Sequence, residues 1–275
     1  MSSNRRKCTL TDGKPTPVTV PSFRAAKAAG RRLAVVTAYD YTAGLIADAA
    51  GVDAVLVGDS LGMVVQGQSN PLDVSLAAMV YHTRCVVRGA TRPLVIADLP
   101  FGSYHESPRQ AVRSAVRLLK AGAQAVKLEG GLRVLPAIVA LIAADIPVMG
   151  HVGLTPQSVH ALGGFKVQRQ AEAILADAKA VAEAGAFSIV VECVPRSVGE
   201  AVTRELRIPT IGIGAGPSCD GQVLVWHDLL GLYDRVKPKF VKRYAEFGSA
   251  MAKSVADYAA DVREGRFPGP EHGFL

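Results

Sequence analysis

One short pattern recurs three times along this chain: an alanine-rich segment ends at a glycine, and a run of apolar residues follows. The pattern reads AAGVDAVLVGD at 49–59, KAGAQAVKLEG at 120–130 and EAGAFSIVVEC at 183–193. Glycine suits the left-handed position that ends a helix, and a short run rich in Val and Ile is typical of a strand buried on both faces. The repeat therefore predicts helix, cap and strand, the unit of a parallel α/β fold.

The same pattern extends along the chain and predicts eight strands separated by helices. The 275 residues suffice for one α/β barrel, which commonly takes about 250 residues. We expect a (β/α)8 TIM barrel rather than a doubly wound sheet, because candidate ligand residues follow many strands instead of one switch point. The expected strands are 33–38, 53–58, 93–97, 124–129, 146–150, 187–192, 208–213 and 222–226. The expected helices are 41–50, 73–88, 108–121, 132–144, 169–184, 196–206 and 239–264, with a short seventh crossover.

The glycine-rich stretch GIGAG at 212–216 belongs to the end of the seventh expected strand. It lacks the GxGxxG register and the position of a dinucleotide-binding fingerprint. Two interpretations stay open: a tight turn, or a place where backbone N–H groups face an anion.

Composition narrows the class of protein. The chain is 49% hydrophobic and only 6% aromatic, as expected for α/β packing with small residues. The net charge of +7 comes from scattered Lys and Arg without a basic stripe, so we expect an anionic small substrate and not nucleic acid. No apolar stretch reaches the roughly 18 residues of a membrane span. We expect no membrane association and a cytoplasmic protein.

The domain organisation is expected to be simple. Residues 1–18 are predicted to form a disordered tail, and residues 19–275 a single catalytic barrel with a C-terminal helix. The cysteines show neither metal-site nor disulfide spacing, so we expect reduced thiols at Cys8, Cys85, Cys193 and Cys219.

Carboxylates follow four of the expected strands at their C-terminal ends, where the strands of a barrel converge on one site. If consecutive strands are neighbours, Asp59, Asp98 and Glu129 lie on one arc of the rim. They would repel one another unless a cation lay among them. A cluster of oxygen ligands favours a hard ion such as Mg²⁺ over zinc or copper. The sequence therefore predicts a magnesium site at these three residues.

Three other side chains are candidates for contact with a substrate. Lys127 shares the inward face of Glu129, and it either holds a substrate oxygen or neutralises the acids; the cost of burying an unpaired lysine favours the first. Glu192, expected across the barrel, is either a general base or a structural carboxylate that caps the next helix. His151, expected just after the fifth strand, either binds substrate or ties down its loop.

Seven motifs stand in a fixed order along the chain. They are TAYDY at 37–41, VGDSLGMVVQG at 57–67, ADLPFGSY at 97–104, VKLEGG at 126–131, GHVGLTPQS at 150–158, VECVP at 191–195 and GIGAGPSCDGQVLVWHD at 212–228. Together they resemble the ketopantoate hydroxymethyltransferase family, from about residue 22 to the PGPEHGF segment near the C-terminus.

The resemblance implies a Mg²⁺-dependent (β/α)8 enzyme of pantothenate biosynthesis that forms a decamer. Such an enzyme transfers a one-carbon unit from 5,10-methylenetetrahydrofolate to 3-methyl-2-oxobutanoate. The family's metal-ligand pattern falls on Asp59, Asp98 and Glu129, its ketoacid-binding pattern on Asp59, Ser60, Asp98 and Lys127, and its proton acceptor on Glu192.

The implied mechanism starts from a ketoacid that chelates Mg²⁺, so that its C3 hydrogen becomes acidic. Glu192 removes this hydrogen, Mg²⁺ and Lys127 stabilise the enolate, and the enolate attacks the methylene carbon carried by the folate. Two other functions stay open. One is a Mg²⁺-dependent carbon–carbon lyase of the phosphoenolpyruvate mutase and isocitrate lyase kind, and the other is a non-catalytic barrel that binds an anion.

Overall fold

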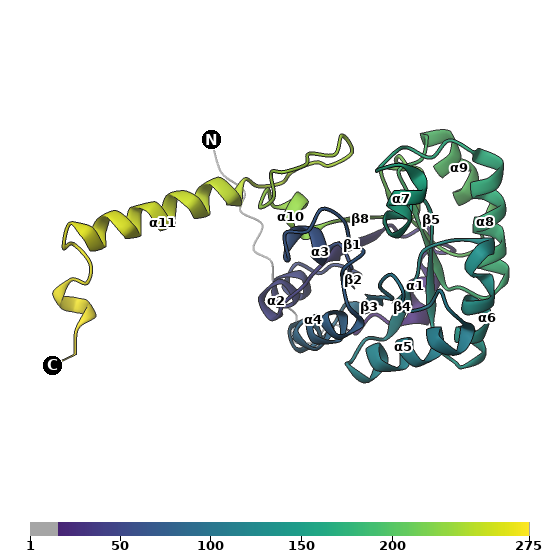
Figure 1. Cartoon of the computed structure of the whole chain (residues 1–275), viewed down its shortest axis with the longest axis horizontal. Helices are drawn as coiled ribbons and strands as arrows, with labels where there is room; N and C mark the ends of the chain where they lie inside the picture. The colour runs from purple at the N-terminus through teal and green to yellow at the C-terminus, as the bar shows by residue number, and fades with distance from the viewer. Residues whose placement is uncertain (1–15, 275) are drawn as a thin grey trace, which may run out of the picture.

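The eight expected strands are present, and each pairs in parallel with the next, with the last closing onto the first (Figure 1). The computed structural model describes residues 16–274. The prediction of a (β/α)8 barrel is confirmed. The strands are β1 (Leu33–Thr37), β2 (Ala54–Val57), β3 (Leu94–Asp98), β4 (Ala125–Lys127), β5 (Val148–Gly153), β6 (Ser188–Glu192), β7 (Thr210–Ile213) and β8 (Gly221–Leu224).

Helices surround the barrel, and several of them begin at a residue whose side chain caps the helix. The side chains of Asp40, Ser75 and Ser107 each accept a hydrogen bond from a backbone N–H of the first turn that follows. Within the described residues, no helix has both the length and the apolar character needed to cross a membrane. The α-helices are α1 (Val20–Ala25), α2 (Tyr41–Ala49), α3 (Leu61–Val64), α4 (Leu76–Gly89), α5 (Pro108–Lys120), α6 (Leu135–Ala143), α7 (Val159–Leu162), α8 (Ala171–Glu183), α9 (Arg196–Glu205), α10 (Trp226–Leu229) and α11 (Phe247–Arg263). Short 3-10 helices are η1 (Leu132–Val134), η2 (Pro156–Ser158) and η3 (Pro270–His272).

The connection from β7 to β8 is short, as expected. It spans residues 214–220 without a helix. Gly214 and Gly216 lie in the left-handed region, with φ of 67° and 88°, which favours glycine. The GIGAG stretch thus ends β7 and begins the turn that takes the chain to the start of β8.

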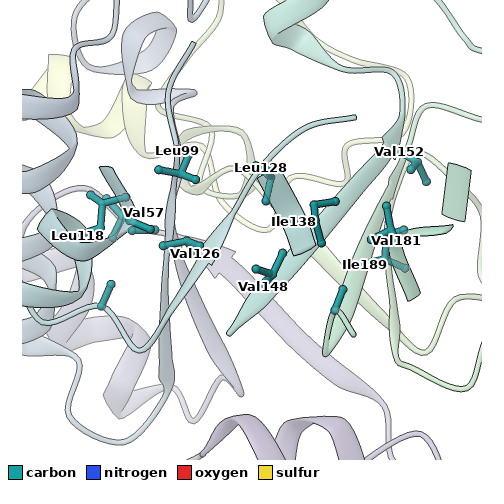
Figure 2. Packing of buried hydrophobic residues seen from close by; sticks show 14 of the residues in the cluster. Val57, Leu99, Leu118, Val126, Leu128, Ile138, Val148, Val152, Val181 and Ile189 are labelled. Atoms are coloured by element: carbon teal, nitrogen blue, oxygen red, sulfur yellow. The ribbon is translucent and has the colours of Figure 1, made fainter. Parts of the chain in front are cut away.

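One apolar layer lies between the strands and the outer helices. Figure 2 shows strand residues such as Val126 and Val148 close to helix residues such as Leu118 and Ile138, all fully or almost fully buried. Burial of side chains of this size stabilises the fold by about 1.5–3 kcal/mol each. This layer fixes the helices to the outside of the barrel.

Two of the outer helices approach so closely that only glycine fits between them. A Cβ atom on Gly89 of α4 would lie 2.4 Å from the carbonyl oxygen of Tyr41 in α2. A Cβ on Gly44 of α2 would lie 2.7 Å from the carbonyl oxygen of Val86 in α4. The distance between α2 and α4 is therefore set by backbone against backbone.

A second apolar cluster fills the lower part of the barrel interior. Its members come from all eight strands. Helix α1 adds the fully buried Phe23, whose ring packs edge-on against that of Phe187 with the ring centroids 5.8 Å apart. Side chains that point inward from alternate strand positions fill such a barrel in layers. The lower layers are closed, so a site can open only at the C-terminal ends of the strands.

The predicted tail is covered only in part. Its residues 1–15 lie outside the described residues, as does Cys8. Val18 is buried, and its N–H donates to the carbonyl oxygen of Arg92 at 2.7 Å, so the packed chain includes this residue. The other cysteines, Cys85, Cys193 and Cys219, are free thiols.

Helix α11 begins later than the expected 239 and extends away from the barrel (Figure 1). None of its residues is buried. Its large apolar side chains recur every three or four residues and so form one stripe on the helix. This apolar stripe consists of Phe247, Met251, Val255, Tyr258 and Val262, each between 45% and 67% exposed.

We propose that a second copy of the chain covers the apolar stripe of α11 and that the protein is a large homo-oligomer. In light scattering at working concentration, its mass should be many times 28.8 kDa. Val255→Lys places a charge in the stripe and should shift the protein to smaller species. Ser249→Lys adds the same charge on the opposite face of the helix and should not. A monomeric unaltered protein would contradict the proposal.

Candidate active site

The inward side chains change from apolar to polar at the last position of several strands. In β3, Leu94 and Ile96 belong to the lower interior cluster, and Asp98 follows two residues later. In β4, Ala125 precedes Lys127 in the same way. Because alternate residues share a face, this sequence pattern places the charged groups directly above the apolar layers. The register pairs Asp98 with Lys127 across the two strands.

A cavity of about 480 Å³ opens above this polar layer. Its volume lies in the range typical of small-molecule sites. The structure brings together every residue that the sequence predicted for the site. Asp59, Ser60, Asp98, Lys127, Glu129, His151 and Glu192 all line this cavity.

Buried carboxylates and a buried lysine form the floor of the polar layer. Lys127 Nζ lies 2.9 Å from Asp98 Oδ1, and the backbone N–H of Asp59 donates to Asp98 Oδ2 at 3.0 Å. Burial, followed by the charges of Asp98 and Glu129, raises the pKa of Asp59 well above its usual range. Burial alone would lower the pKa of Lys127, but the three surrounding carboxylates outweigh it and raise that pKa. Lys127 is thus held in its charged form.

His151 lies inside β5, not after it as expected, and its ring joins two acids. Nδ1 is 3.5 Å from Oε1 of Glu129, and Nε2 is 3.1 Å from Oε2 of Glu192. Burial and Lys127 oppose a charge on the ring, but these two carboxylates prevail and raise the pKa of His151 to about 9. His151 thus links Glu192 to Glu129, while the strand order places β6 opposite β2, as expected.

Glu192 differs from the other acids in its exposure. Its side chain is 15% exposed, whereas those of Asp98 and Glu129 are only 3% and 2% exposed. The sequence left two roles open for Glu192, a general base or a helix cap, and its position at the cavity suits the general base. A carboxylate that caps α9 is not observed, since that helix has no side-chain cap.

Sequence reasoning missed two polar side chains that support the site. Gln157 donates its side-chain amide to Asp59 Oδ2 at 2.7 Å. The hydroxyl of Tyr39 lies 2.9 Å from Ser60 Oγ, and the carbonyl oxygen of Tyr39 is bonded by the ring of His82 at 2.6 Å. Both residues belong to motifs visible in the sequence, TPQS and TAYDY, but their partners are remote along the chain.

The polar layer has the chemistry expected of a Mg²⁺ site. Asp98 Oδ1 is buried and has no aligned hydrogen-bond donor, although Lys127 lies at ion-pair distance. Among residues 16–274, no three Asp, Glu, His or Cys side chains gather closely enough to hold a metal by themselves. Mg²⁺ commonly takes one or two carboxylates and completes its shell with water and substrate, so Asp59 and Asp98 with Glu129 nearby fit that ion.

The raised pKa of His151 predicts a pH dependence of the metal-free protein. Protonated His151 stabilises the folded state fully below its ordinary pKa of 6.5, and this contribution is lost as the pH rises through about 9. Between pH 6.5 and 9, the free energy of unfolding should fall by up to about 3 kcal/mol more than in His151→Asn. Denaturant titrations measure this difference, with the exposed His160→Asn as control. An equal fall in His151→Asn would mean that the ring is neutral in the folded protein.

Solved structures of similar fold are enzymes that the chain resembles only distantly in sequence. Phosphonopyruvate hydrolase in complex with oxalate and Mg²⁺ aligns with a TM-score of 0.62 at 15% identity, over 92% of both chains. For 2,3-dimethylmalate lyase, described as a member of the PEP mutase/isocitrate lyase superfamily, the TM-score is 0.56 at 18% identity, over 90% of this chain and 93% of that one. At such identities, the likeness shows the fold alone.

Sequence relatives are much more similar. A 3-methyl-2-oxobutanoate hydroxymethyltransferase of Moorella thermoacetica is 55% identical over 262 residues, covering 94% of this chain and 97% of that protein. The enzyme of the same name from Heliobacterium modesticaldum is 53% identical, with 94% and 95% covered. A family model described as ketopantoate hydroxymethyltransferase matches residues 17–270. With nearly the whole chain matched in this way, the protein belongs to the ketopantoate hydroxymethyltransferase family.

Proposed function

We propose that this protein transfers a hydroxymethyl group from 5,10-methylenetetrahydrofolate to 3-methyl-2-oxobutanoate and so makes ketopantoate, the first step of pantothenate biosynthesis. The observation that carries the proposal is a single cavity in which buried Lys127 and three buried carboxylates lie beside the more exposed carboxylate of Glu192. The names of relatives more than half identical to this chain support the same reaction.

The ketoacid would bind at the polar layer. Asp59, Asp98 and Glu129 would hold Mg²⁺, which when bound supplies a Lewis acid that makes the C3 hydrogen of the ketoacid more acidic. The ammonium group of Lys127, kept charged by its neighbours, stabilises negative charge on a substrate oxygen. The hydroxyl of Ser60 is free to donate to the substrate carboxylate, since the hydroxyl of Tyr39 can donate to it in turn.

Glu192 would act as the general base. His151 Nε2 lies at ion-pair distance from Glu192 Oε2, 3.1 Å, and the partial exposure of Glu192 lets its carboxylate reach the cavity. The C3–H bond breaks, the proton moves to Glu192, and the electron pair spreads onto the keto oxygen. C3 then bonds to the methylene carbon, both bonds from that carbon to the folate nitrogens break, and one water supplies the hydroxyl oxygen. The two hydrogens of the water and the proton held by Glu192 end on the two folate nitrogens and the new hydroxyl group. The products are ketopantoate and tetrahydrofolate.

The apolar parts of the cavity support two substrates of different size. The cavity is lined by Leu56, Val190 and Val223, which also belong to the lower apolar cluster. This apolar floor suits the branched end of the ketoacid. Phe165 and Phe240 line the same cavity and are 49% and 37% exposed. Exposed aromatic rings suit a flat second substrate such as the pterin of a folate.

An assay of ketoacid consumption tests the function. The protein should consume 3-methyl-2-oxobutanoate only with both Mg²⁺ and 5,10-methylenetetrahydrofolate present, and removal of the metal with EDTA should stop the reaction. A carbon–carbon lyase would cleave its substrate without folate. A non-catalytic anion-binding barrel would bind the ketoacid and leave it unchanged. Either of these results would reject the proposal.

Replacement of the proposed base separates proton removal from binding. Glu192→Gln should bind the ketoacid nearly as well as the unaltered protein, because the amide keeps the size of the side chain. Loss of a general base typically lowers the rate by about 10²–10⁴-fold. The folate-dependent reaction and the folate-independent exchange of the C3 hydrogen with deuterated water should therefore fall by comparable factors.

Proton NMR of the C3 signal measures this exchange directly. The exposed residue Glu200 on α9 offers a matched control, since Glu200→Gln makes the same chemical change away from the cavity. Exchange at the unaltered rate in Glu192→Gln would assign the base to another group, with His151 the nearest candidate.

A further inference from the structure

Gln157 is a buried, uncharged residue with polar contacts to two acids of the site. It lies in η2, directly after β5, and only 5% of it is exposed. Its backbone N–H donates to Glu129 Oε2 at 2.9 Å. Its side-chain nitrogen donates to Asp59 Oδ2 at 2.7 Å and to the carbonyl oxygen of Leu99 at 3.0 Å. The reaction as proposed above gives this residue no role.

The surroundings of Gln157 allow one orientation of its amide. The two hydrogens of Nε2 face two acceptors, the Asp59 carboxylate and the Leu99 carbonyl oxygen. Oε1 accepts from the buried hydroxyl of Tyr104 at 2.7 Å. A flipped amide would place an oxygen against two acceptors, which is unfavourable in a buried site. Tyr104 in turn accepts the backbone N–H of Glu129 at 3.2 Å, so the network closes on the same acid.

The two acids held by Gln157 come from different parts of the barrel. Asp59 follows β2 and Glu129 follows β4, and each gives one carboxylate oxygen to Gln157. When both are ionised, as cation ligands must be, their like charges drive the two side chains apart. Gln157 opposes this with neutral donors, which fix the carboxylates without cancelling their charge. Lys127 acts differently, because its ammonium group offsets the charge that it contacts.

We propose that Gln157 is a positioning residue that holds Asp59 and Glu129 in the arrangement that receives the divalent cation. The inference rests on the proposed function, since it takes these acids to be cation ligands. Groups that orient metal ligands from behind are often worth a factor of about 10–100 in metal affinity. A purely structural glutamine would instead affect the stability of the fold and leave the cation affinity unchanged.

Metal binding by a neutral variant tests this role. Gln157→Met keeps the length of the side chain and the backbone N–H but removes the amide. Mn²⁺ is a suitable probe because it accepts the same oxygen ligands and its free form is measured by EPR. The variant should bind Mn²⁺ about 10–100-fold more weakly than the unaltered protein. The matched control Gln170→Met, at an exposed position, should bind as the unaltered protein does.

Circular dichroism and thermal unfolding of the metal-free proteins establish that the variants are folded. If Gln157→Met is folded and binds Mn²⁺ with unaltered affinity, the inference is rejected. If it does not fold, Tyr104→Phe decides, because it removes the hydroxyl that orients the amide and that also bonds the backbone of Glu129. Its Mn²⁺ affinity should fall several-fold, and no change would reject the inference. Absence of Mn²⁺ binding by the unaltered protein would instead reject the proposed metal site, and the inference with it.

Discussion

Buried negative charge at the C-terminal rim of the barrel is the constraint on which the site depends. Asp59, Asp98 and Glu129 are all buried; Asp98 and Glu129 raise the cost of ionising Asp59, and Glu129 raises that of Asp98. Lys127 offsets part of this charge, and a protonated His151 offsets another part. The raised pKa of Asp59 and the charged state of Lys127 thus have the same origin in these buried, crowded carboxylates. The site is a set of acids kept close together at an energetic cost.

Apolar packing in the lower part of the barrel supplies the stability that offsets this energetic cost. Apolar side chains fill its interior, and Phe23 of α1 closes it from below. These layers contain no group that titrates, so they hold the strand ends in place whatever the charge state above them. The same strands build both halves of the barrel. Every second residue of a strand points inward, and these inward residues are apolar in the lower half and polar at the C-terminal end.

Much of this arrangement could be predicted from the sequence, since strand ends and inward positions follow from local patterns. The place of His151 could not. The segment GHVG has the glycines of a loop, yet it extends β5 because Gly153 pairs with Glu192 of the neighbouring strand. The late start of α11 was also missed: the chain before it is bonded to the end of α10, with Tyr244 donating to Leu229. The role of Gln157 could not be predicted, because its hydrogen-bond partner Asp59 lies 98 positions away in the sequence and only the fold brings the two together.

The close contact of α2 and α4 links the outer surface of the protein to the cavity at the barrel rim. Gly89 touches the backbone of Tyr41, at the start of α2, and α4 also carries His82, which holds the carbonyl group of Tyr39. The hydroxyl of Tyr39 in turn fixes Ser60. The spacing between α2 and α4 therefore helps to fix the position of Tyr39 and, through it, that of the Ser60 hydroxyl. A side chain added at Gly89 would press on Tyr41 and Leu45 from outside, without touching any residue that lines the cavity.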